Sequence, residues 1–263
     1  MKPRKRLFCR LGLGVILVVS FLAYGLSTSA WADPSPEQQR RLEAHYALER
    51  PEGRGPFPAV MMVPMCIGFD LALWNGNYAR AAKKLKDQGF VVLKVDYLAA
   101  REAPRCGAVT QEDIAQDIVT TVKYLRAQSF VKTTAINVLA WGYGGGGALI
   151  ALSEGNNRSP APADAVVAYY PPFERLPAPW KVDVPVLFLC AGKDFKAPPS
   201  RVEDLLSQVP ARDRVKFLVY PDVYHGFDNS DLPAEMLTPA GTWGYNEKAA
   251  KAAWEEVERF LRR

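Results

Sequence analysis

Short apolar runs alternate with segments of helical periodicity along most of this chain. The apolar runs are hydrophobic at consecutive positions, which is typical of strands that are buried on both faces of a sheet. They cover residues 59–63, 90–96, 134–141, 165–170, 184–190 and 215–220. Amphipathic helices are predicted between and after them, around 78–85, 110–125, 200–209 and 250–261. This alternation predicts one α/β domain, with a mostly parallel central sheet and helices on both faces.

The segment 134–149 shows how one of these strands passes into its helix. The apolar run is followed directly by Gly142-Tyr143-Gly144 and three further glycines, and apolar positions then continue. Small residues allow a strand to turn sharply into a helix that packs closely behind it. This is the pattern of a nucleophile elbow, whose signature is G-x-S-x-G. Aligned with that signature, Gly142 falls at the nucleophile position, so the sequence predicts an elbow without a nucleophilic side chain.

Two polar residues follow the last two predicted strands. Asp194 comes directly after the strand 184–190, and His225 comes shortly after the strand 215–220. In sheets of this kind, ligands bind beyond the carboxyl ends of the strands. A histidine can take a proton from a nucleophile and return it to a leaving group, while a buried carboxylate orients the imidazole. Each residue alone is common in turns and loops, but their order and placement predict a catalytic Asp–His pair.

Four short motifs together carry a family resemblance. They are Asp96-Tyr97, the 140–146 elbow, Gly192-Lys193-Asp194, and Tyr220-Pro221 followed by His225-Gly226-Phe227. On these motifs, residues 57–262 resemble the dienelactone hydrolase family of the α/β-hydrolase superfamily, especially exported members with a cysteine after the first core strand. The resemblance implies an α/β-hydrolase fold and hydrolysis of esters or lactones by a serine or cysteine with Asp194 and His225. It implies no cofactor and no metal.

The resemblance also assigns roles around the elbow. In the family, backbone N–H groups after the first core strand and after the nucleophile form an oxyanion hole, which here implies Cys66 and Tyr143. Tyr143 is also expected to line the substrate pocket. Arg101 lies close to the position of an arginine that holds a substrate carboxylate. The chain departs from the family at Pro64-Met65, where relatives have His-Gly, and at Asp228-Asn229, where a second arginine is expected.

The missing nucleophile leaves two main functions open. The first is a pseudo-hydrolase that binds a small ester- or carboxylate-like ligand with Asp194 and His225 retained. The second is an active hydrolase of small carboxylic esters or lactones that uses water or Cys66 as its nucleophile. Loss of the nucleophile costs a serine hydrolase about 10⁶ in turnover, which favours the first hypothesis. A structural domain without a pocket is a third possibility.

Three cysteines lie beyond the N-terminal segment. Cys190 lies in an apolar run and is expected to be a small buried residue. In the implied fold the strands before Cys66 and Cys106 are neighbours, so the loops that carry these two cysteines are adjacent. We therefore predict a Cys66–Cys106 disulfide, which an exported protein can keep.

The first 32 residues have the pattern of a secretory signal peptide. Five basic residues precede an apolar stretch over 11–25, and Ala30-Trp31-Ala32 is a typical cleavage site. The alternative is an uncleaved membrane anchor, but about fifteen apolar residues are few for a span, which needs about 20. The predicted parts are a signal peptide (1–32), an N-terminal extension (33–56) with a polar helix near 34–50, and the hydrolase domain (57–263). The mature protein is expected to be periplasmic or secreted.

The net charge of the chain depends on this segment. Its formal charge is +5, but without the five N-terminal lysines and arginines, 28 of the 33 basic residues remain against 28 acidic residues. A balanced charge gives no support to nucleic acid or an anionic membrane surface as a partner. The expected partner is a small molecule.

Overall fold

The computed structural model describes residues 35–155, 163–173, 176, 180, 182–209 and 212–262. The predicted signal peptide, residues 1–32, lies outside the described residues. None of the helices described here is long and apolar enough to cross a membrane.

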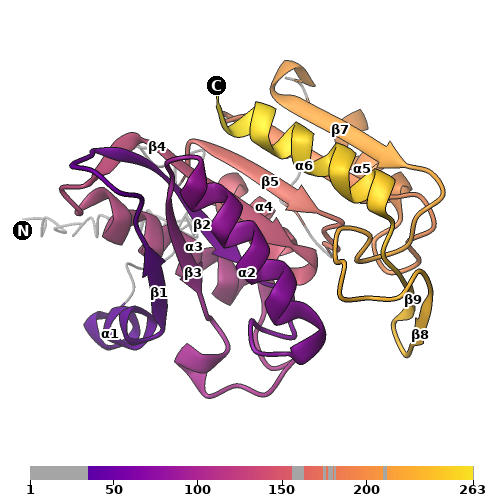
Figure 1. Ribbon diagram of the computed structural model, residues 1–263, viewed down its shortest axis with the longest axis horizontal. Helices are drawn as coiled ribbons and strands as arrows, with labels where there is room; N and C mark the ends of the chain where they lie inside the picture. Colours follow the sequence, from indigo (N-terminus) through magenta and orange to yellow (C-terminus); the bar gives the residue numbers. More distant parts are fainter. Residues whose placement is uncertain are drawn as a thin grey trace, which may run out of the picture. The chain divides into compact units, whose positions relative to one another are not determined.

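A seven-stranded sheet forms the centre of the structure (Figure 1). Its strands are β1 (Tyr46–Glu49), β2 (Phe57–Val63), β3 (Val91–Val95), β4 (Val131–Trp141), β5 (Ala165–Tyr169), β6 (Val186–Ala191) and β7 (Val215–Tyr220). Their order is β1-β3-β2-β4-β5-β6-β7. β1 pairs antiparallel with β3, and the other neighbours are parallel. All six predicted strands are confirmed, and the parallel pairing brings their carboxyl ends to one edge of the sheet.

Helices cover both faces of this sheet. α2 (Ala72–Asp87) and α6 (Glu247–Leu261) share one buried core on one face. α3 (Gln111–Arg126) and α4 (Gly142–Gly155) pack together on the other face (Figure 1). The remaining elements are α1 (Pro36–Ala44), α5 (Pro199–Ser207), the short 3₁₀ helices η1 (Ala99–Arg101) and η2 (Arg212–Arg214), and the hairpin of β8 (Met236–Thr238) and β9 (Gly241–Trp243).

The local sequence explains where α3 begins and where α2 ends. Thr110 caps α3, because its hydroxyl oxygen accepts a hydrogen bond from the Asp113 N–H at 3.1 Å. The Asp113 carboxylate in turn accepts from the Thr110 N–H at 3.1 Å, which completes a capping box. α2 ends before Gly89, whose φ of +89° is readily adopted by glycine. Both helices overlap the helical segments predicted around 78–85 and 110–125.

The N-terminal segment differs from the prediction. The polar helix expected near residues 34–50 ends at Ala44, and Tyr46–Glu49 forms the edge strand β1. The Tyr46 hydroxyl lies 2.7 Å from Thr121 Oγ1 of α3, and pairing with β3 fixes the strand. These contacts are long-range, so local periodicity could not show them. Part of the predicted 33–56 extension therefore belongs to the sheet.

Candidate active site

The predicted elbow is present where β4 passes directly into α4. Gly142 is the first residue of α4, and its φ of +48° lies in the left-handed region. The following glycines have no room for a side chain: a Cβ on Gly144 would overlap the carbonyl oxygen of Pro64, and one on Gly147 would overlap Ile114 of α3. The glycines therefore allow α4 to pack closely against α3 and against the loop that follows β2.

The side chain of Met65 fills the space in front of Gly142. A Cβ added to Gly142 would lie 2.9 Å from Cγ and 3.0 Å from Sδ of Met65. Met65 is buried, and its backbone N–H donates to the hydroxyl of Tyr78 at 3.1 Å. The hydroxyl of Tyr97 donates to the carbonyl of Pro64 at 3.3 Å. The loop after β2 is thus held so that a thioether lies where a nucleophilic side chain would begin.

Asp194 and His225 lie together as predicted. Nδ1 of His225 is 2.7 Å from Oδ2 of Asp194, and both side chains are buried. Oδ1 of Asp194 accepts hydrogen bonds from the backbone N–H groups of Lys196 at 2.8 Å and Ala197 at 2.9 Å. The Gly244 N–H donates to the carbonyl of His225 at 3.0 Å, which ties the histidine loop to the β8–β9 hairpin. Since the carboxylate accepts at Nδ1, the Nε2 side of the imidazole is the side available to a ligand.

Aromatic side chains that the sequence reasoning missed surround the histidine. The ring centroids of Tyr170 and Trp243 lie 4.3 Å and 5.2 Å from that of His225. Tyr170 has a φ of +36°, which is unusual for a residue with a side chain. Trp74 packs edge-on against Trp243, with 5.9 Å between ring centroids. The Nε1 atoms of Trp74 and Trp243 are buried, and neither has a hydrogen-bond partner among the described residues.

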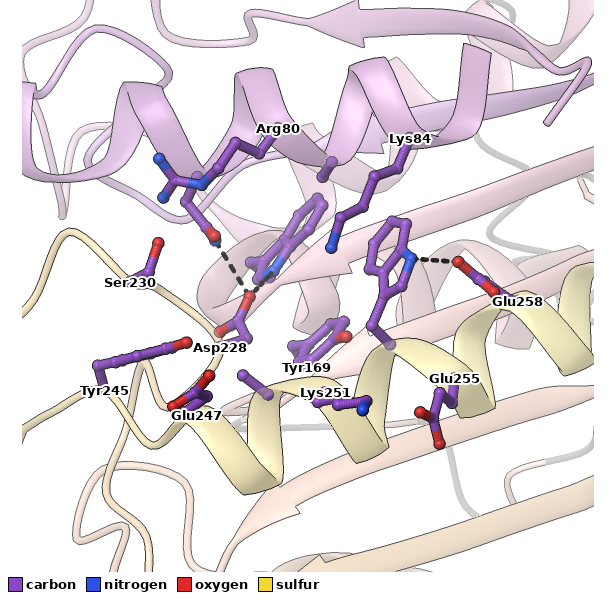
Figure 2. Close-up of a pocket in the computed structure, with 15 residues that line it drawn as sticks. Arg80, Lys84, Tyr169, Asp228, Ser230, Tyr245, Glu247, Lys251, Glu255 and Glu258 are labelled. Carbon is purple, nitrogen blue, oxygen red and sulfur yellow. Dashed lines mark hydrogen bonds between the residues drawn. The ribbon is translucent and has the colours of Figure 1, made fainter. Parts of the chain in front are cut away.

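Asp228 is hydrogen-bonded to Tyr170, whose ring packs against that of the histidine. The Tyr170 hydroxyl donates to Oδ1 of Asp228 at 2.5 Å. Trp141 Nε1 and Asn77 Nδ2 donate to Oδ2 at 2.8 Å and 3.1 Å (Figure 2). Burial raises the pKa of Asp228, and these three hydrogen bonds oppose the rise. In the sequence, position 228 is notable only because it holds an aspartate where the family resemblance leads us to expect an arginine.

The predicted disulfide between Cys66 and Cys106 is confirmed, with a Cα–Cα distance of 4.6 Å. Its presence corrects one alternative: a sulfur bonded to Cys106 is not a thiolate, so Cys66 cannot be the displaced nucleophile in this form. Cys190 is free and buried, as expected. Tyr143 follows Gly142 in α4 and Cys66 follows Met65. The oxyanion role of their backbone N–H groups stays a prediction.

Arg101 forms an ion pair with a buried carboxylate of α3. Nη2 of Arg101 donates to Oδ1 of Asp117 at 2.8 Å, and Nη1 also contacts this carboxylate and the carbonyl of Tyr97. Asp117 lies in α3, and its side chain is only 1% exposed. The positive charge of Arg101 is therefore already compensated, and the structure gives no support to its binding a substrate carboxylate. Across the described part of the chain, no group of three or more His, Cys, Asp or Glu side chains could hold a metal ion.

One protein-family model matches most of the chain. The model of the dienelactone hydrolase family matches residues 44–263, which includes β1 as well as the predicted domain. The chain belongs to the dienelactone hydrolase family. A protein of Saccharolobus solfataricus described as a candidate carboxymethylenebutenolidase is 29% identical over 161 residues. That alignment covers 59% of this chain and 53% of the relative, so this chain spans about half the length of the curated relative it matches.

Solved structures place the chain in the α/β-hydrolase fold. A candidate dienelactone hydrolase from Klebsiella pneumoniae has a TM-score of 0.65 at 17% identity, covering 83% of this chain and 92% of that one. The dienelactone hydrolase from Anabaena variabilis has a TM-score of 0.61 at 18% identity, covering 82% and 90%. Identities this low show the fold alone. The predicted fold class is confirmed.

Proposed function

We propose that this member of the dienelactone hydrolase family is a pseudo-hydrolase that binds a small ester- or carboxylate-like molecule beside His225. The observation that carries the proposal is the contact between Met65 and Gly142. The nucleophilic side chain is absent from the elbow, and the space it would enter is filled by a thioether. Without a nucleophile, a serine hydrolase loses about 10⁶ in turnover. The disulfide removes Cys66 as a substitute.

Ligand binding is supported by the groups around the histidine. The Asp194–His225 pair is intact, with Nδ1 and Oδ2 2.7 Å apart. Trp74 and Trp243 each carry a buried indole N–H without a partner in the described structure. A buried donor without an acceptor costs about 1–3 kcal/mol, and a carbonyl or carboxylate oxygen that reaches it would recover this energy. An oxygen-rich ligand thus fits the donors that this site presents.

The proposal predicts that the purified mature protein does not turn over esters through the elbow. Hydrolysis of p-nitrophenyl acetate and butyrate is expected to be equal, within twofold, for the wild type and His225→Ala. A serine-directed fluorophosphonate is expected to leave the wild type unlabelled. In the same protein, butyrate is expected to shift the indole N–H signals of Trp74 and Trp243 in NMR spectra. Absence of these shifts would refute ligand binding at this position.

The alternative function is an active hydrolase in which His225 activates a water molecule. The retained Asp194–His225 pair favours it, because orientation of an imidazole by a carboxylate is what general-base catalysis requires. In that case the wild type turns over p-nitrophenyl esters without an acyl-enzyme burst, and His225→Ala loses the activity. This outcome would overturn the pseudo-hydrolase proposal while leaving the family assignment intact.

A further inference from the structure

A pocket lies between α2 and α6, on the face of the sheet that these two helices share. Its volume is about 480 Å³ (Figure 2). Trp141, Tyr169 and Asp228 line it together with residues of both helices. Tyr169 ends β5, and Asp228 comes three residues after His225. The pocket therefore adjoins the elbow, since Trp141 directly precedes Gly142, but it is distinct from the Asp194–His225 pair.

The carboxylate of Asp228 has no charged partner in this pocket. Its three side-chain hydrogen-bond donors, from Tyr170, Trp141 and Asn77, are all neutral. Within the described residues, no lysine, arginine or histidine nitrogen lies within 4.0 Å of it. A carboxylate withdrawn from water in a protein normally has a cationic partner, because desolvation of an unpaired charge is costly. The part of Asp228 that stays accessible lines the pocket.

Tyr169 supplies a second polar group that lacks a partner. The residue is only 1% exposed, and its hydroxyl points into the pocket (Figure 2). Among the described residues it has no hydrogen-bond partner. Like a carboxylate, a phenol oxygen can accept a hydrogen bond from an N–H donor. The Asp228 carboxylate also receives a hydrogen bond from its own backbone N–H, so it acts on a ligand mainly through its negative charge, while the Tyr169 oxygen can accept a hydrogen bond.

The aromatic residues of the pocket favour positive charge. Trp141 and Tyr169 stack with an interplanar angle of 9°, and both line the pocket. On α6, the ring of Trp254 already holds the ammonium group of Lys84 at 4.9 Å from its centroid. Aromatic faces attract cations by about 0.5–2 kcal/mol, depending on how far the cation is desolvated.

The charged side chains of the pocket do not cancel Asp228. The lining contains four carboxylates, from Asp228, Glu247, Glu255 and Glu258, and three cationic groups, from Arg80, Lys84 and Lys251. Arg80 is paired with Asp231, with 2.9 Å between Nη1 and Oδ1. Lys84 lies over Trp254 and outside ion-pair distance of Asp228. The deepest charge of the pocket is therefore negative and uncompensated.

From these contacts the geometry points to a binding site for a small primary amine in its ammonium form. Asp228 is the counter-ion, the Tyr169 hydroxyl is a second acceptor, and the rings of Trp141 and Tyr169 pack against the ligand. The site is independent of whether His225 supports hydrolysis, because neither Asp194 nor His225 lines this pocket.

The test uses benzylamine hydrochloride as the probe, with benzyl alcohol as a neutral analogue and phenylacetate as an anionic one. The affinities of the mature protein (residues 33–263) for these probes are measured by NMR titration at pH 7 and constant ionic strength. Benzylammonium is expected to bind at least tenfold more tightly than benzyl alcohol. Asp228→Asn is expected to weaken the binding of benzylammonium at least tenfold and the binding of benzyl alcohol less than threefold. The matched control Asp222→Asn, at a side chain that is 87% exposed, is expected to change neither.

Three outcomes would overturn the inference. The first is equal binding of amine and alcohol by the wild type. The second is tighter binding of phenylacetate, which would assign the pocket to its lysines. The third is a preference for the amine that survives in folded Asp228→Asn. If that variant does not fold, the wild type decides: benzylammonium, and not benzyl alcohol, is expected to shift the Trp141 indole N–H signal, and no such shift would refute the site.

Discussion

Met65 and Gly142 meet at the strand–helix junction, and the proposed loss of hydrolysis rests on how close they lie. A Cβ at position 142 would lie 2.9 Å from Cγ of Met65, closer than real Cβ atoms approach other heavy atoms. The Asp194–His225 pair behind it is in place. Restoration of a nucleophile therefore involves two residues, one to supply the hydroxyl and one to clear its path.

Gly142→Ser alone is expected to gain little reactivity, because the new side chain has to displace the buried Met65 thioether. Gly142→Ser with Met65→Ala is expected to react with a fluorophosphonate at least tenfold faster than the single variant. Labelling followed by mass spectrometry of the serine peptide measures both rates. Met65→Ala alone serves as the unlabelled control. Since Met→Ala in a core costs about 2–5 kcal/mol, the fold of each variant is checked by circular dichroism.

Two results would contradict this prediction. Equal labelling of the single and double variants would mean that Met65 moves aside freely. No labelling of a folded double variant would mean that the Asp194–His225 pair cannot activate a serine at position 142.

The sequence correctly predicted those contacts between residues that follow from the order of the strands along the chain. Asp194 and His225 each follow a strand, and parallel strands bring their carboxyl ends together, so their pairing could be foreseen. The position of the Met65 side chain could not, because it depends on how the loop after β2 folds back on the elbow. The ion pair of Arg101 with Asp117 could not be predicted either, because the spacing of residues in α3 does not show which of its side chains meets an arginine.

At the scale of elements, the disulfide joins the loops that follow β2 and β3, two neighbouring strands of the sheet. The two cysteines are 40 residues apart in sequence. In the chain-entropy description, closing a loop of that length stabilises the folded state by roughly 4 kcal/mol.

Reduction is therefore expected to lower the free energy of unfolding by roughly 4 kcal/mol, measured by urea denaturation with and without dithiothreitol. Cys66→Ser with Cys106→Ser should show the same loss and should not respond to the reductant, because the remaining Cys190 is buried and free. A wild type whose unfolding is indifferent to reductant would show that the bond does not stabilise the fold.

The sequence predicted elements well where their signal was local. Continuous apolar runs predicted β2 to β7, and helical periodicity predicted α2, α3, α5 and α6. β1 was missed because Tyr46–Glu49 is held by β3 and α3, both distant in sequence. The β8–β9 hairpin was missed because its strands have three residues each, too few for alternation to be visible.

At the scale of the whole molecule, the basic excess of the chain lies in its first 32 residues. The remaining 231 residues carry equal numbers of basic and acidic side chains. When the full chain is expressed in a bacterium with its own N-terminus, the exported form is expected to begin at Asp33, as measured by intact mass and N-terminal sequencing. Ala30→Phe with Ala32→Phe is expected to leave the 263-residue precursor uncut. An exported wild type that retains residues 1–32 would instead support the membrane anchor.

The elbow has a further consequence for the energy of the fold. A serine or cysteine held at a φ of +48° would carry backbone strain of about 1–3 kcal/mol, whereas glycine adopts this conformation freely and loses only about 0.5–1 kcal/mol in chain entropy. The turn at Gly142 thus has the backbone shape of a nucleophile elbow without the strain that a serine or cysteine would carry there. Close packing of α4 against Pro64 and Ile114 preserves that shape. The backbone at this junction is therefore held in place by its neighbours, whichever residue occupies position 142.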